Sequence, residues 1–383
     1  MLMILRDERK RAIFDQVLFL VIVSAFIYYL SANLIENLNR LGISTGFSFL
    51  WQEAGYQIGG ALIDFDDTDS YALAHIVGLL NTLLATFLII VSASILGFII
   101  GILRMSPNPL MTNSIRYVIE VIRNIPSLVH IVIWFSLALH LPPVRQSFDI
   151  YNTVFISNRG IYLPDPNFES GMWGVLFLFI CLLAYAFFRK RKAQQLMRET
   201  GKYQATFLSN TLIIWGGTIC AYLLFGLPIT WQAPTLSGFD FDGGITIAPE
   251  LFAIWIALSI YFSSHVAELV RGGVQSVSKG QFEAASALGV RYSITMKMVV
   301  IPQAMRVIVP PLTNVYQNIL KTTSLGVAIG YAEMTATTGG TTLNLTGQAI
   351  ECILLMMVSY GIISLIIAAI MDQINKHVAI VER

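Results

Sequence analysis

The stretch Val77–Leu103 reads VGLLNTLLATFLIIVSASILGFIIGIL, and none of its side chains carries a charge. A membrane-spanning helix needs about 20 mostly apolar residues to cross roughly 30 Å of hydrocarbon, so this stretch is long enough to cross a bilayer. Lipid offers no hydrogen-bond partners to the backbone, which favours a helix over an open strand. Of all 383 residues, 55% are hydrophobic and 12% are charged, about half the charged fraction of a soluble domain. We therefore predict an all-α, polytopic membrane protein.

Seven further stretches meet the same criterion. The eight predicted spans lie near residues 14–36, 77–103, 122–141, 172–188, 207–227, 250–270, 312–331 and 350–371. The seventh is the weakest, because it contains several amides and Lys321. The first predicted span follows a basic N-terminus, so it could instead be the apolar part of a cleaved signal peptide. No clear small-x-small cleavage site follows it, which favours an uncleaved span.

Charges between the spans test this count through the positive-inside rule. With eight spans, the basic segments 6–11, 189–202 and 271–306 all fall on one side of the membrane. The acidic segments 53–69 and 240–242 fall on the other side. Both termini are therefore predicted to be cytoplasmic. The net charge of +1 gives no reason to expect a nucleic-acid partner.

The spans and charges suggest six consecutive regions. They are a cytoplasmic tail with the first span (1–36), an extracytoplasmic segment (37–76), a first part of a helical core (77–141), an insertion with two additional spans (142–247), a second part of the core with a cytoplasmic segment at 271–306 (248–375), and a cytoplasmic tail (376–383).

The sequence lacks the common signatures of enzymes and metal sites. Its one Gly-Lys pair, Gly201-Lys202, is followed by Tyr203 and is not part of G-x-x-x-x-G-K-[ST], the loop that cradles nucleotide phosphates. No His, Cys and carboxylate cluster has metal-ligand spacing, and G-x-S-x-G is absent. We therefore expect no enzymatic activity, no metal and no cofactor bound by this chain.

The most informative segment follows the sixth predicted span. Ser278 and Gln281 have the S-x-x-Q spacing of a capping box, so a helix is expected to begin there. Gly289 stands where a left-handed glycine would end it. Ala284 and Ala285 keep this helix slim, which suits insertion into a groove on another protein. An ordinary interfacial helix remains the alternative.

This segment resembles a known family motif. Glu283-Ala284-Ala285, then Gly289, then Val299-Val300-Ile301-Pro302 is similar to the EAA loop of binding-protein-dependent ABC importer permeases. The family pattern ends in Ile-x-Leu-Pro, from which Val299 and Ile301 depart conservatively.

Other segments are similar to the polar amino-acid uptake branch of that family. They are Asn81-Thr82-Leu83, Arg123-Asn124-Ile125-Pro126, Ala267–Gly273, Ile301–Ala304 and Lys321–Leu325. The family usually has Gly-Thr where this chain has Asn124-Ile125. The outer segment from Gly46 to Gly59 and the overall layout most resemble the permeases of general L-amino-acid ABC systems.

The resemblance implies a five-helix type I importer core with extra helices, in the bacterial inner membrane. It also implies that Glu283, Ala284, Ala285, Gly289 and Pro302 couple the chain to a separate ATP-binding cassette ATPase dimer, which holds ATP and Mg. The further implied partners are an extracytoplasmic amino-acid-binding protein and a second permease. We expect that permease to be a paralogue, although a second copy of this chain stays possible.

Polar residues inside predicted spans are costly in lipid and often face a path or a partner. Gln317, Asn318 and Lys321 share one side of the seventh predicted span, and His265 and Glu268 share a face of the sixth. We predict that they line a path for a zwitterionic amino acid, with a cation for its carboxylate and a carboxylate for its ammonium.

A simpler interpretation of these residues stays open. Glu268 would then pair with Arg271, and Lys321 would extend its ammonium toward the interface. Arg123, Asn124 and Arg271 are expected to position helices rather than to contact substrate.

Two local predictions concern the ends of the seventh span. Pro310-Pro311 is expected to start its helix, and Gly339-Gly340 is expected to form a turn after it.

Two other functions compete with the importer permease. An ion-driven secondary transporter would show repeats with paired broken helices, which the sequence does not show. A membrane scaffold without a transport path is the second alternative.

Overall fold

The computed structural model describes residues 8–40, 46–200 and 205–378. Residues 1–7 and 379–383 of the predicted cytoplasmic ends, and Lys202 of the predicted basic segment, lie outside this range. The chain divides into two compact units. The first unit is Met1–Trp134 with Ala253–Arg383, and the second is Phe135–Phe252.

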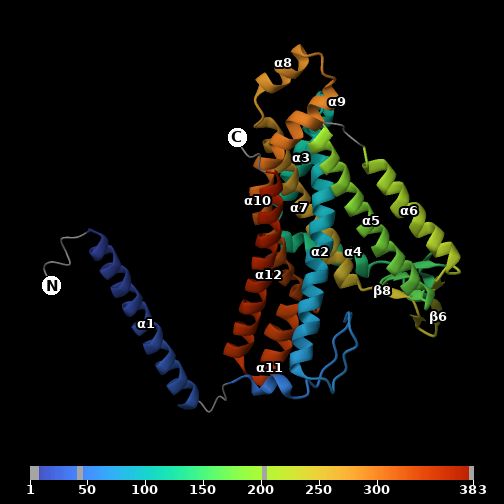
Figure 1. The fold of residues 1–383 in the computed structure, drawn as a ribbon. Helices are drawn as coiled ribbons and strands as arrows, with labels where there is room; N and C mark the ends of the chain where they lie inside the picture. Colours follow the sequence, from blue (N-terminus) through green and yellow to red (C-terminus); the bar gives the residue numbers. More distant parts are fainter. Residues whose placement is uncertain (1–7, 41–45, 201–204, 379–383) are drawn as a thin grey trace. The chain divides into compact units, whose positions relative to one another are not determined.

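Long helices dominate the structure (Figure 1). They are α1 (Glu8–Arg40), α2 (Tyr71–Leu103), α3 (Pro109–Asn124), α4 (Ser127–Leu139), α5 (Gly171–Thr200), α6 (Phe207–Leu224), α7 (Pro249–Gln275), α10 (Ile301–Thr322) and α12 (Ala349–Val378). Shorter helical segments are η1 (Phe47–Trp51), η2 (Val144–Gln146), α8 (Lys279–Ala287), α9 (Tyr292–Thr295), η3 (Met296–Val300), η4 (Thr323–Ile329), η5 (Thr335–Thr342) and α11 (Leu343–Thr346). Among the described residues, 7 helical stretches are long and apolar enough to cross a membrane, and a bent pair brings the number to 8.

The bent pair corrects the third predicted span. Residues 122–141 do not form one straight helix, because α3 ends at Asn124, α4 begins at Ser127, and their axes differ by 97°. The break falls at Ile125-Pro126. A proline disfavours helical geometry in the residue before it, and Ile125 is indeed extended, with φ −88° and ψ 128°.

The prediction for Pro310-Pro311 was wrong. Both prolines lie inside α10, and the helix instead has Pro302 in its first turn. Proline at a helix start costs no backbone hydrogen bond, so the rule was right but was applied to the wrong prolines. Prolines inside a membrane helix are tolerated where neighbouring groups compensate for the lost bond.

Gly339-Gly340 does not form the predicted turn. Both glycines belong to η5, a wide π-helical segment. This segment is held against α2 by side chains far away in sequence. Asn81 donates from Nδ2 to the Ala332 carbonyl at 2.8 Å, and the Met334 N–H donates to Thr82 Oγ1 at 3.1 Å. Residues 330–342 therefore form part of the core rather than an outer loop.

The helices α2 and α7 approach each other closely at two glycines. A Cβ on Gly97 would lie 2.4 Å from the Val266 Cβ, and a Cβ on Gly101 would lie 2.7 Å from the Val270 Cβ. This small-xxx-small spacing lets backbones approach closely in a membrane, where packing rather than hydrophobicity drives helix association.

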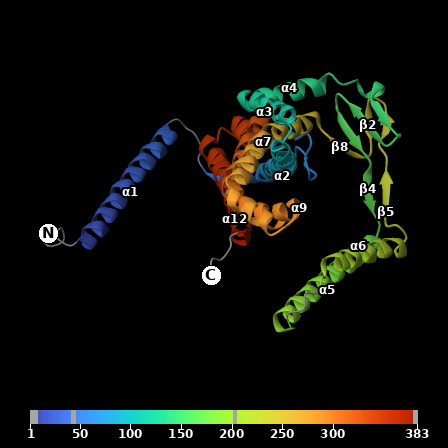
Figure 2. The ribbon, with the colours of Figure 1, turned by 90° about the horizontal axis from the view of Figure 1, so that it is seen from above.

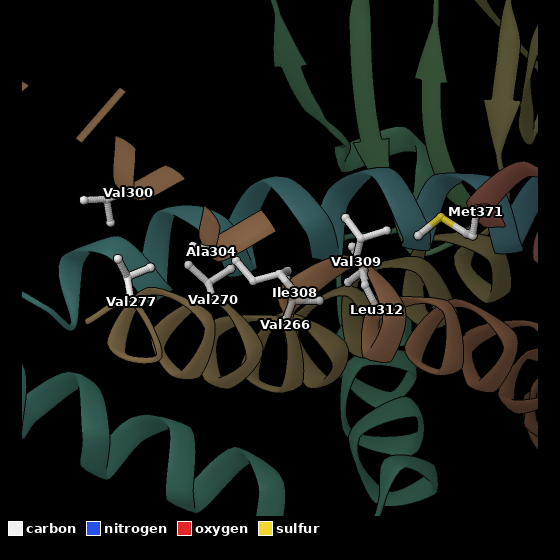
Figure 3. Close-up of a cluster of buried hydrophobic side chains, with 9 residues drawn as sticks. All are labelled: Val266, Val270, Val277, Val300, Ala304, Ile308, Val309, Leu312 and Met371. Carbon is white, nitrogen blue, oxygen red and sulfur yellow. The ribbon is translucent and has the colours of Figure 1, made fainter. Parts of the chain in front are cut away.

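The same two valines, Val266 and Val270, belong to a buried apolar cluster through which α7 also packs on α10 and α12 (Figure 3). Its members are Val266, Val270, Val277, Val300, Ala304, Ile308, Val309, Leu312 and Met371. Gly273 permits this approach, because a Cβ there would meet Ile308 Cγ1 at 2.3 Å.

The second unit contains a helical hairpin and short strands. The hairpin is formed by α5 and α6, and the Asn210 Nδ2 donates to the Ala186 carbonyl at 3.1 Å between them. The strands are β1 (Phe148–Ile150), β2 (Val154–Ser157), β3 (Gly160–Leu163), β4 (Asp165–Phe168), β5 (Ile229–Gln232), β6 (Thr235–Ser237), β7 (Asp240–Asp242) and β8 (Ile245–Ile247).

These strands form three antiparallel sheets. One has the order β1-β2-β3-β8, β4 pairs with β5, and β6 pairs with β7. Figure 2 shows β4 and β5 side by side, next to the helical hairpin. Tyr162 donates a hydrogen bond to Asp240 at 2.6 Å, and burial together with this bond raises the pKa of Tyr162 to about 12. The helical prediction for the spans is confirmed, but these strands were not predicted.

We expect Gly97→Leu to disrupt the fold, because its side chain would overlap Val266 and Ser263. Overpacking of this kind costs about 1–3 kcal/mol or more. The matched control is Gly361→Leu on α12, where a Cβ meets nothing within 4 Å among the described residues. The midpoint temperature of thermal unfolding in detergent should fall for Gly97→Leu and stay unchanged for Gly361→Leu. An equal midpoint for both variants would contradict the close α2–α7 contact.

Candidate functional site

The predicted coupling helix is α8. It begins after Ser278 as predicted, but the Ser278 side chain makes no capping hydrogen bond. Instead the Gln281 N–H donates to the Ser278 backbone carbonyl at 3.0 Å. The predicted start of α8 is therefore confirmed, and the predicted capping-box interaction was wrong.

The end of α8 follows the sequence signal closely. Gly289 has φ +69°, its N–H donates to the Ser286 carbonyl at 2.9 Å, and the Val290 N–H donates to the Ala285 carbonyl at 3.1 Å. These two bonds define the Schellman motif, in which a left-handed glycine ends a helix. The chain therefore turns sharply at Gly289 toward α9 and η3.

One side of α8 is attached to the core and the other is open. Ala285 is buried, and Phe282 packs on the apolar cluster around Val300. The open side carries Glu283 and Ala284, and Leu288 beside them is 81% exposed. An exposed leucine next to an exposed carboxylate is a surface that another protein can cover.

A polar bond connects α8 to the start of α10. Gln303 Nε2 donates to Gln281 Oε1 at 3.3 Å, one residue beyond Pro302. A displacement of α8 can therefore be passed to α10 through this bond and through the packing of Phe282. Such shifts of packed helices are an ordinary means of switching.

The predicted polar path is divided in the structure. Glu268 pairs with Arg271 at 3.0 Å and also with Arg104 at the end of α2. Glu268 therefore pairs with Arg271, as the simpler interpretation expected. Arg104, whose side chain is only 10% exposed, was missed because nothing local in the sequence links α2 to α7.

His265 also contacts its own neighbourhood. Its Nδ1 lies 3.1 Å from the Tyr261 carbonyl, and the two rings are 4.8 Å apart. His265 and Glu268 are thus engaged by other groups, and in the described part of the chain no hydrogen bond or ion pair joins either of them to Lys321.

The three residues of α10 that were predicted to share one side of the seventh span face two directions. Gln317 donates from Nε2 to the Ser364 carbonyl of α12 at 3.4 Å. Asn318 and Lys321 are exposed, and Asn314 is exposed one turn earlier. Residues at i, i+4 and i+7 share one helix face. We call Asn314, Asn318 and Lys321 the polar stripe of α10.

Arg123 and Asn124 are the last residues of α3, directly before the bend. Both are exposed. The third span bends directly after them, and their role in positioning helices stays a prediction.

A buried carboxylate was missed at the sequence level. Glu333 is fully buried and accepts hydrogen bonds from the Ala336 N–H and the Tyr360 hydroxyl, both at 2.9 Å. Tyr331 beside it donates to the Asn81 carbonyl at 2.8 Å. The available signal was that Glu333 is the single charged residue between Lys321 and Glu351.

The geometry defines a class: a multi-pass helical membrane protein with a short helix, α8, open on one side, and a polar stripe on a spanning helix. Residues 203–379 match the family described as binding-protein-dependent transport system inner membrane component. The chain is 44% identical to a putative amino-acid ABC transporter permease protein, YhdX, of Escherichia coli, over 97% of this chain and 95% of that protein.

Two further relatives are similar over their full extent. The general L-amino acid transport system permease protein AapQ of Rhizobium johnstonii is 38% identical, over 98% of this chain and 94% of the relative. The glutamate/glutamine/aspartate/asparagine transport system permease protein BztB of Rhodobacter capsulatus is 36% identical, over 100% and 96%. The chain belongs to the family of ABC transporter permeases that work with binding proteins.

Family membership confirms several predictions. The chain is a multi-pass inner-membrane transport subunit and not an enzyme. Its partners include an ATPase on a separate subunit and a substrate-binding protein.

We expect Glu268→Gln to destabilise the protein by about 2 kcal/mol, because it leaves the mostly buried Arg104 without its carboxylate. The control is Glu120→Gln, whose pair with Arg116 is exposed on both sides and should contribute less than about 0.5 kcal/mol. Thermal unfolding of the purified protein compares the two. A larger loss for Glu120→Gln would show that the Arg104–Glu268 pair is not a stabilising contact.

Proposed function

We propose that this chain is the translocating permease of an ATP-driven amino-acid importer and that the polar stripe of α10 lines its path. The observation that carries the proposal is the exposure of Asn314, Asn318 and Lys321 on a membrane-spanning helix. Polar groups facing lipid are costly. The stripe is therefore better accommodated by a water-filled path or a protein partner than by acyl chains.

The charge of the stripe suits an amino acid. Among the described residues, no carboxylate pairs with Lys321, so its ammonium is free to meet a substrate carboxylate. The amides of Asn314 and Asn318 both donate and accept hydrogen bonds. The relatives named above are amino-acid permeases, which supports the same substrate class.

A second permease would complete the path. The stripe is open in the single chain, and a facing subunit would enclose it from the other side. We propose a paralogous permease as that subunit, with both termini of this chain in the cytoplasm. This chain would bind no ATP or Mg itself.

Coupling to the ATPase would use the open side of α8. Glu283 and Ala284 lie on that side, Ala285 attaches the helix to the core, Gly289 ends it, and Pro302 lies in the first turn of α10. Force applied to α8 would reach the polar stripe through α10, since the stripe lies on that same helix.

Replacing the stripe should impair transport without unfolding the protein. Asn318→Leu or Lys321→Met should lower uptake by the complete importer at least about tenfold, because a substrate hydrogen bond is lost. Gln317→Met is the matched control, since Gln317 faces α12, and its uptake should stay within about twofold. Initial uptake rates of radiolabelled amino acids in proteoliposomes test this. Unchanged uptake in both stripe variants would contradict the proposed path.

Charge reversal on α8 should uncouple the ATPase. We expect Glu283→Lys to reduce uptake and ATPase co-purification at least about tenfold, because reversing an exposed charge on α8 would disturb the electrostatic complementarity of the proposed interface. Asp64→Lys, the same reversal at an exposed acid of the 46–70 segment, is the control. Full ATPase co-purification with Glu283→Lys would contradict docking at α8.

Family membership favours this function over the ion-driven transporter and the scaffold, and energy dependence tests it directly. Uptake should persist when the ion gradient is collapsed and stop when ATP is depleted. Uptake that survives ATP depletion and stops with the ion gradient would contradict the proposed function.

A further inference from the structure

The α5–α6 hairpin has a strongly basic end. Arg189, Lys190, Arg191 and Lys192 are consecutive on α5. The 18 residues of α6 span about 27 Å, close to the thickness of the hydrocarbon core. The start of α6 at Phe207 therefore lies at a membrane interface. The Asn210–Ala186 hydrogen bond places the basic end of α5 at that same level.

A groove between the two helices opens beside these cations. Its volume is about 430 Å³, within the range of small-molecule sites. The lining is mostly apolar, with Phe187, Met197 and Ile214, and it includes Lys190 and Thr206. The groove thus combines an apolar wall with a cation at the level of the lipid headgroups.

Within the described residues, the basic run is not neutralised by carboxylates. In the described part of the chain, no carboxylate forms an ion pair with any of the four cations. Arg191 instead lies over the Phe187 ring at 4.5 Å. Glu199, the one acid of α5, accepts a hydrogen bond from Gln195 at 2.9 Å. Lys190 is therefore available to an external anion.

A second observation points to a ligand. Asn210 lines the groove, and its Oδ1 is buried without a hydrogen-bond partner among the described residues. Its Nδ2 is engaged with Ala186, so the free atom is an acceptor. A buried acceptor without a donor is costly, and a ligand hydroxyl would relieve that cost.

We propose that this groove binds one anionic phospholipid with a hydroxyl-bearing headgroup, such as phosphatidylglycerol. Its phosphate would contact Lys190, a headgroup hydroxyl would donate to Asn210 Oδ1, and an acyl chain would lie along Phe187 and Ile214. Basic pockets between membrane helices are known binding places for anionic headgroups. The mostly apolar lining favours a lipid over a soluble phosphate.

Native mass spectrometry of the complete, delipidated importer, titrated with phosphatidylglycerol, tests the proposal. The key variant is Lys190→Gln. The matched control is Lys192→Gln, with the same loss of charge on a residue that lines a separate depression with Tyr185 and Phe188. Removing one charge reduces the general attraction of the basic run for the lipid, which should weaken binding about fivefold at most in either variant. Loss of the direct contact should weaken it about 30-fold in Lys190→Gln.

A second pair of variants keeps the test valid if Lys190→Gln folds poorly. Thr211→Trp should fill the groove and abolish binding without changing the charge, and Lys190→Arg should retain most binding. Three results would overturn the proposal: equal losses in the two glutamine variants, equal binding of zwitterionic phosphatidylcholine, or displacement of the lipid by millimolar inorganic phosphate.

Discussion

The fold depends on the small-residue face of α2. In lipid, helices gain little from burying apolar surface, so close backbone approach must hold them together. Gly97 and Gly101 admit α7, and a Cβ on Gly78 would lie 2.1 Å from Thr337 Oγ1 in η5. Val266 and Val270, which meet Gly97 and Gly101, also belong to the cluster that α7 shares with α10 and α12. The packing on α2 therefore helps to determine where α8 and the polar stripe of α10 lie.

Hydropathy predicted the spans because their signal is local and long. It failed where a single residue changes the geometry, as at Pro126, which breaks the third span. It also failed for the strands, since elements of three or four residues such as β8 are too short to show an alternating pattern. The chain directly before η5 bonds to Asn81 and Thr82, which lie far away in sequence. No local pattern encodes such contacts.

The site was predictable to the extent that its signals were local. Gly289 marks the end of α8 because a left-handed conformation favours glycine. Adjacent Gln317 and Asn318 were indistinguishable in sequence, yet one bonds to α12 and the other is open. Which side of a polar helix faces a partner depends on packing. The same is true of Arg104, whose relation to Glu268 exists only after α2 and α7 have met.

The acids discussed above have partners within the chain, whereas the cation of the polar stripe has no carboxylate partner among the described residues. The acids are satisfied by the chain itself, Glu268 by two arginines and Glu333 by Tyr360 and a backbone N–H. Lys321, by contrast, has no carboxylate partner in the described part of the chain. An unpaired cation on a spanning helix persists only where water, a partner or a ligand stabilises it. Lys321 therefore stays open to a carboxylate from outside the chain, whereas Glu268 is already engaged by Arg104 and Arg271.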